Sequence, residues 1–235
     1  MENAYLNIAK RDIETAEIMF EAERYPEALF YLQQSAEKAI KYIALRTEIT
    51  SKKEVITYVG HDIRNFIIRV TQDFVYKNRP EEFSNYDRKQ INISINKISN
   101  SIISGDTVIS EFIYIFNIEN IIKLFEGCNI KKTKSNHSNL VKKLKSNSES
   151  LESVLAAFRL FIIAFFTFNH YEDLRYPVKE KNKIYNTPDQ IYKKGNPVIA
   201  NLDLVIQNLK LSIELIEKGF EESTFIRISE KKRSL

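Results

Sequence analysis

The sequence predicts an all-α protein, folded as an up-and-down helical bundle, and two observations carry this prediction. The 235 residues include five Gly and five Pro, fewer than the turns of a strand-rich chain require. Apolar residues make up 43% of the chain, and in most segments they recur every three or four residues, which places them on one face of a helix. A chain of this length can bury one sizeable core.

Two helices with a short connection are predicted at the start of the chain. The first carries an apolar stripe over residues 6–20, and Tyr25 and Pro26 interrupt the pattern after it. Because Pro is well tolerated in the first turn of a helix, a second helix is expected to begin there, with its stripe over residues 29–43. The two should form an antiparallel helical hairpin.

Three further helices are predicted in the middle of the chain. Gly60 ends the connector after the hairpin, and a third helix should begin near His61, with its apolar stripe over residues 63–74. The runs at 91–102 and 108–125 have helical spacing despite their β-branched residues, so we expect an inserted helical pair.

The most apolar stretch, residues 151–168, is expected to be a buried central helix. Its apolar part contains Arg159 and is shorter than the roughly 20 residues that a membrane span requires, so no membrane partner is expected. Pro177 predicts a helix exit, and the polar stretch from there to Pro197 reads as a loop. A last helix carries its stripe over residues 202–216.

The expected organisation is a bundle interrupted by an insertion. Residues 1–77 and 151–220 form the helical bundle, residues 78–150 a helical insertion with a lysine-rich connector, and residues 221–235 a basic tail. Between residues 128 and 148 the connector carries six lysines and no acidic residue. It is either a solvated loop or a phosphate-contacting patch, although it lacks the interleaved aromatic residues of single-strand binders.

Composition also bounds the chemistry and the location. The single cysteine, Cys128, excludes an intrachain disulfide, and the N-terminus lacks the features of a signal peptide, so a cytoplasmic location is expected. The sequence has no Gly-rich phosphate loop, no metal-spaced Cys or His set, no nucleophile elbow and no His-Glu-x-x-His motif. We therefore expect no cofactor and no metal site.

Four motifs, in order along the chain, resemble the HEPN domain family (higher eukaryotes and prokaryotes nucleotide-binding). They are Asp12 and Ala16 in the first helix, Tyr25, Ala28, Gln34, Glu37, Lys38 and Lys41 in the second, then His61, Asp62 and Ile63, and finally Arg175, Tyr176 and Pro177. The resemblance covers about residues 4–76 and 151–218. It implies a helical bundle that binds a nucleotide, a homodimer, and a nucleotidyltransferase-like partner of the kind found in toxin–antitoxin modules.

The matched residues predict a binding cleft for an anion. Gln34, Lys38 and Lys41 line one face of the second helix, and Arg175 follows a helix end with a guanidinium suited to phosphate. The predicted set that binds a nucleotide or another phosphate-bearing ligand is Gln34, Lys38, Lys41, His61, Arg175 and Tyr176. The alternative is a structural network of ion pairs and hydrogen bonds among Glu37, Lys38, His61 and Arg175.

The sequence favours a non-catalytic binding module. HEPN ribonucleases use an Arg followed, after four to six residues, by a His, and no His of this chain has an Arg at that distance before it. His170 and Arg175 stand at a comparable spacing in reverse order and are the remaining catalytic candidates. Two alternatives stay open: a ribonuclease toxin that pairs His170 with Arg159 or Arg175, and an interaction scaffold built on residues 86–125.

Overall fold

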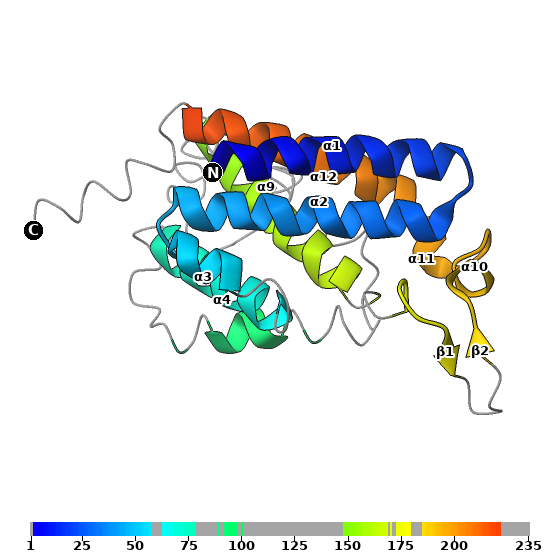
Figure 1. Cartoon of the computed structure of the whole chain (residues 1–235). Helices are drawn as coiled ribbons and strands as arrows, with labels where there is room; N and C mark the ends of the chain where they lie inside the picture. Colours follow the sequence, from blue (N-terminus) through cyan, green and yellow to red (C-terminus); the bar gives the residue numbers. More distant parts are fainter. Residues whose placement is uncertain are drawn as a thin grey trace, which may run out of the picture.

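Four long helices dominate the part of the chain that the computed structural model describes (Figure 1). The described residues are 2–57, 63–78, 89, 92–97, 100, 148–168, 170, 173–179 and 185–221. The long helices are α1 (Glu2–Glu21), α2 (Tyr25–Arg46), α9 (Ser148–Phe168) and α12 (Leu202–Glu221). The prediction of an all-α bundle is confirmed.

The antiparallel hairpin of α1 and α2 follows from its turn and from small residues at its seam. Glu23 adopts a positive φ of 57°, which ends α1, and Pro26 occupies the first turn of α2. Ser35 Oγ donates a hydrogen bond of 2.8 Å to the carbonyl of Ala9 across the seam. Side chains without bulk let the two backbones approach closely; those fully buried are Ala9, Ala16, Ala28 and Ala36.

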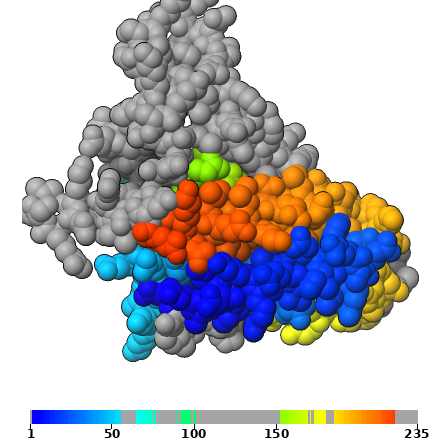
Figure 2. Space-filling view, turned by 90° about the horizontal axis from the view of Figure 1, so that it is seen from above, coloured from blue at the N-terminus to red at the C-terminus, as the bar shows by residue number. Residues whose placement is uncertain are grey.

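The two late helices complete the bundle, although more than a hundred residues separate them from the hairpin. Lys10 Nζ lies 2.5 Å from Glu217, and Lys210 Nζ lies 2.8 Å from Glu17, so α12 runs antiparallel to α1. Figure 2 shows the two helices side by side on one face of the molecule. Arg159 Nε, on α9, lies 3.3 Å from Ser212 Oγ on α12 and joins these helices inside the core.

Helix α9 is the central helix of the core, as its apolar sequence predicts. Leu160 and Ile163 are fully buried, and the ring of Phe161 meets that of Phe74 edge-on, with centroids 5.4 Å apart. Its other faces pack against α2 and α12, which explains why it is apolar almost all round. Among the described residues, no helix combines the length and the apolarity needed to cross a membrane.

Two helices flank the bundle beside α2 (Figure 1). They are α3 (Lys52–Thr57) and α4 (Ile63–Asn78). The stripe predicted for the third helix is confirmed in α4, since Ile67, Val70 and Phe74 are buried. The sequence predicted a plain connector before α4; the structure corrects this prediction, because α3 lies within that segment.

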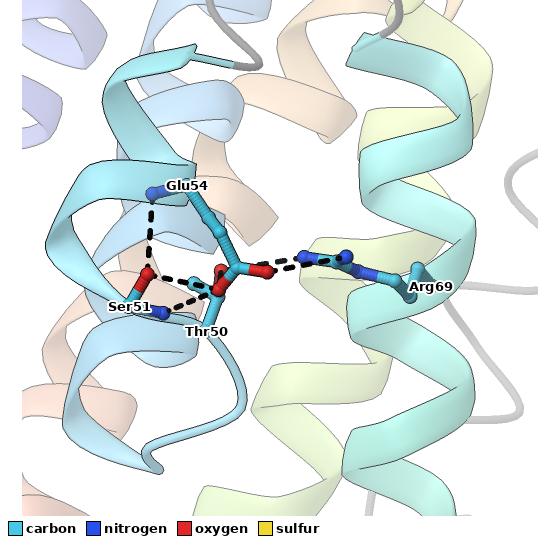
Figure 3. Close-up of polar contacts among 4 residues, drawn as sticks. All are labelled: Thr50, Ser51, Glu54 and Arg69. Atoms are coloured by element: carbon cyan, nitrogen blue, oxygen red, sulfur yellow. Dashed lines mark hydrogen bonds and ion pairs between the residues drawn. The ribbon is translucent and has the colours of Figure 1, made fainter.

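A capping box explains why α3 forms (Figure 3). The backbone N–H of Ser51 donates to Glu54 Oε2 at 2.8 Å, and the backbone N–H of Glu54 donates to Ser51 Oγ at 3.2 Å. Thr50 Oγ1 donates to the same carboxylate at 3.0 Å. Arg69, on α4, reaches across to Thr50 Oγ1 at 3.3 Å and to Glu54 Oε1 at 3.8 Å, so the cap also ties α3 to α4.

The segment between α9 and α12 is more regular than the predicted loop. It holds a two-stranded antiparallel sheet and two short helices at one end of the bundle (Figure 1): β1 (Val178–Lys179), β2 (Tyr185–Asn186), α10 (Pro188–Ile191) and α11 (Pro197–Ala200). Caps stabilise both helices, because Thr187 heads a capping box and Asn196 Oδ1 accepts from the Val198 N–H at 2.8 Å.

Little of the predicted insertion, residues 78–150, is among the described residues. Residues 92–97 are helical, Ile95 is buried, and Gln72 of α4 donates to Asn96 Oδ1 at 3.2 Å. The rest of the predicted helical pair, the lysine-rich connector and the basic tail lie outside the described part of the chain.

Candidate functional site

A row of side chains along α2 contains two residues of the predicted ligand set, Gln34 and Lys41. Phe30, Gln34, Glu37 and Lys41 are spaced by four, three and four residues, which places them on one face of the helix. The row changes character along its length. Gln34 is partly exposed, whereas Lys41 is 1% exposed.

Glu37 holds both lysines of the predicted set. Its Oε1 accepts from Lys41 Nζ and lies 3.2 Å from Lys38 Nζ. Lys38 Nζ also donates to Gln34 Oε1 at 3.0 Å. An ammonium has three donors, so these two partners leave one N–H of Lys38 for a further acceptor. Part of the alternative structural network, the Glu37–Lys38 pair, is therefore present.

Helix α1 supplies the other wall of this polar seam. The ring centroid of Tyr5 lies 5.9 Å from Lys41 Nζ, a cation–π distance. Burial lowers the pKa of Lys41, and the Glu37 carboxylate opposes this shift. Burial raises the pKa of Asp12, and the charge of Lys38 opposes it. Within this seam, burial therefore disfavours the charged forms of Lys41 and Asp12, and neighbouring opposite charges favour them.

Arg175 reaches α2, but not the end that carries Lys41. Its guanidinium carbon lies 5.8 Å from the ring centroid of Phe30. Phe30 and Lys41 are eleven residues apart, about 16 Å along the helix axis, so Arg175 approaches the half of α2 that carries Gln34. Tyr176 follows Arg175 with its side chain 67% exposed.

His61, also in the predicted ligand set, lies outside the described residues. The remaining catalytic candidate, His170, is half-buried just after α9. Its Nδ1 lies 3.0 Å from the hydroxyl of Tyr192, and burial lowers its pKa, partly opposed by Asp173. The neutral imidazole is therefore favoured at neutral pH.

Arg159 and Arg175, the two arginines of the ribonuclease alternative, contact groups other than His170. Arg159 is 1% exposed and contacts Ser212 at 3.3 Å and Glu152 at 3.4 Å. The guanidinium of Arg175 lies over the Phe30 ring, at a cation–π distance. Within the described ranges, no group of three or more His, Cys, Asp and Glu side chains could hold a metal ion.

Sequence reasoning missed two participants. Phe30 was overlooked because an aromatic residue within a helical stripe normally signals core, although its spacing of four from Gln34 would have placed it on the ligand face. Tyr192 was overlooked because nothing local marks a residue of a polar stretch as a partner of His170. Tyr192 and His170 are brought together by the fold.

Comparison with known proteins identifies the domain. The family model of the HEPN domain matches residues 3–92. The resemblance predicted from the motifs is therefore confirmed over this part of the chain, which includes α2, α3, α4 and nearly all of α1. The resemblance predicted for residues 151–218 stays a prediction. The match ends inside the predicted insertion and does not reach α9 and α12. No curated protein and no solved structure matches the chain.

Proposed function

We propose that this chain is a non-catalytic HEPN binding module that holds a nucleotide or another phosphate-bearing ligand at the α2 surface. We define the α2 surface by five residues: Phe30, Gln34, Lys38, Arg175 and Tyr176. The observation that carries the proposal is the position of Arg175 over Phe30. Phe30, Gln34 and Lys38 are spaced by four residues, so the Arg175 guanidinium lies over the same helical stripe as Lys38.

The chemistry of the α2 surface suits a phosphorylated ligand with a planar base. Arg175 offers a planar fork of donors for phosphate, and Lys38 offers a point charge with an N–H to spare. Both are within reach of solvent, since Arg175 is exposed and Lys38 is partly exposed. The ring of Tyr176, 67% exposed, is available to stack on a base.

In this proposal Lys41 acts indirectly. Its side chain is almost completely buried, so it holds the Glu37 carboxylate rather than the ligand. Glu37 in turn fixes Lys38 at 3.2 Å. The role of His61 stays a prediction.

The partner proteins stay part of the proposal. Leu204 and Leu211 are exposed seven residues apart, hence on one outward face of α12, which supports a homodimer as well as docking of a nucleotidyltransferase-like protein. The chain mass is 27.5 kDa, so light scattering separates monomer from dimer, and Leu211→Glu should convert a dimer that uses this face into monomer.

Isothermal titration calorimetry with ATP, GTP, AMP and inorganic phosphate tests the binding function. We expect Arg175→Ala and Lys38→Ala to weaken nucleotide binding by about tenfold or more, the usual effect of losing a hydrogen bond to a charged group. Arg24→Ala is the matched control, because Arg24 is also exposed and its partner is Glu27 on the same helix. Its affinity should equal that of the wild type.

Three outcomes would contradict the proposal. Absence of heat with every nucleotide would remove the ligand, and equal heats for wild type and Arg175→Ala would remove the α2 surface as its site. Cleavage of RNA by the wild type, lost in His170→Ala, would replace the binding module with the ribonuclease alternative.

A further inference from the structure

A buried tyrosine connects the short helix α10 to the turn that carries Arg175. Tyr192 is 2% exposed and forms the C-cap of α10, where its backbone N–H donates to the Pro188 carbonyl at 2.8 Å. Its hydroxyl lies 3.0 Å from His170 Nδ1 and 3.5 Å from Asp173 Oδ2. One hydroxyl therefore bridges two residues of the turn that leads into Arg175.

Other contacts of the described residues also hold this turn. The backbone N–H of His170 donates to the Thr167 carbonyl at 3.1 Å, and that of Leu174 donates to the His170 carbonyl at 3.1 Å. The imidazole of His170 lies edge-on between two rings, with centroids 5.6 Å from those of Phe166 and Tyr192. These contacts fix residues 170 and 174, and Arg175 follows directly.

The three polar groups can form one chain with a consistent direction. With the proton on Nδ1, His170 donates to the Tyr192 oxygen, and the Tyr192 hydroxyl donates to the Asp173 carboxylate. Because the hydroxyl has only one proton, this direction is the one that serves both contacts. Helix α10 also packs against α2, the helix that carries Phe30, so Tyr192 is held by the same element on which Arg175 rests.

We infer that Tyr192 is a positioning residue, which sets the place of Arg175 on Phe30 through His170 and Asp173. Its effect on ligand affinity rests on the proposed function, whereas its effect on the position of Arg175 does not. Tyr192 itself is buried and does not contact the ligand.

Tyr192→Phe tests this inference, because it keeps the ring and removes only the hydroxyl. The first readout needs no ligand: the Phe30 ring should shift the NMR resonance of the Arg175 side-chain N–H, and that resonance should move toward its solvent-exposed value in Tyr192→Phe. Tyr185→Phe is the control, since Tyr185 is exposed in β2. It should leave the resonance in place. If Tyr192→Phe fails to fold, Asp173→Ala breaks the same chain from its other end, because it removes the acceptor of the Tyr192 hydroxyl.

The second readout is a double-mutant cycle on ATP affinity. We expect Tyr192→Phe to weaken binding by roughly three- to tenfold, the usual net effect of losing an intramolecular hydrogen bond, and to have no further effect in the Arg175→Ala background. An unmoved Arg175 resonance, or fully additive losses in the cycle, would overturn the inference. If Arg175→Ala binds ATP as tightly as the wild type, the proposed ligand site is refuted, but the positioning role of Tyr192 is not. The Arg175 resonance in Tyr192→Phe then tests that role by itself.

Discussion

Replacing Glu37 with Gln tests the polar seam between α1 and α2. The substitution keeps the shape of the side chain and removes its charge, while Lys41 stays buried with 2% of its side chain exposed. Breaking a buried ion pair from one side costs about 3–5 kcal/mol, because the remaining charge is left without compensation. The Gln carbonyl still accepts one hydrogen bond from Lys41, so we expect a loss of about 2–3 kcal/mol.

Urea unfolding followed by circular dichroism measures this loss. Glu27→Gln is the matched control: it makes the same change on the same helix, but Glu27 and its partner Arg24 have 35% and 59% of their side chains exposed. An exposed pair contributes little, so the control should lose less than about 1 kcal/mol. Equal losses in the two variants would refute the view that the seam is a desolvated ion pair.

The pH dependence gives a second check on Glu37→Gln. Burial lowers the pKa of Lys41 below 10.5, and Glu37 opposes that shift. In the variant the opposing charge is gone, so the pKa in the folded state falls further below its unfolded value. Between the folded-state and the unfolded-state pKa of Lys41, the unfolded state then binds more protons than the folded state. The unfolding free energy of the variant therefore rises with pH over this range. The deficit relative to wild type should shrink as the pH rises toward 10.5, the ordinary pKa of a lysine.

Three further substitutions probe separate features, each by urea unfolding or hydrogen exchange. Arg159→Ala should cost more than about 3 kcal/mol, because it empties a buried site and removes the contacts of the guanidinium with Ser212 and Glu152; a loss under about 1 kcal/mol would contradict the α9–α12 contact. Ser51→Ala should cost about 1 kcal/mol and speed exchange in α3 alone, while unchanged α3 protection would argue against the cap. Gln33 is fully buried, and neither of its amide atoms has a hydrogen-bond partner within the described part of the chain, so Gln33→Leu should stabilise the protein by about 1–2 kcal/mol; destabilisation would show that another group satisfies this amide.

The long helices were predictable from the sequence because each carries a continuous apolar stripe. The stripe over residues 6–20 and the nearly uniform apolarity of residues 151–168 both correspond to helices with buried faces. The short helices were not predicted, because a helix of four to six residues has no stripe to detect. Their caps at Ser51, Thr187 and Asn196 were visible in the sequence as local signals.

The predicted site was harder to place than the fold. Spacing alone put Gln34, Lys38 and Lys41 on one face of α2, and the structure agrees with that. Spacing could not predict that Glu37 binds both lysines or that Lys41 is buried. The burial of Lys41 depends on the packing of α1 side chains, such as Tyr5, against this part of α2. Nor could it place Arg175 over Phe30, a contact between segments 145 residues apart in the sequence.

The most direct test of the account is an NMR titration of the labelled protein with ATP. Binding at the α2 surface predicts that the largest shift changes fall on Gln34, Lys38, Arg175 and Tyr176, and that Lys52 in α3 stays unchanged. Changes that gather on α3 and α4, or none at any nucleotide concentration, would contradict the proposal that this chain binds a nucleotide where Arg175 meets α2.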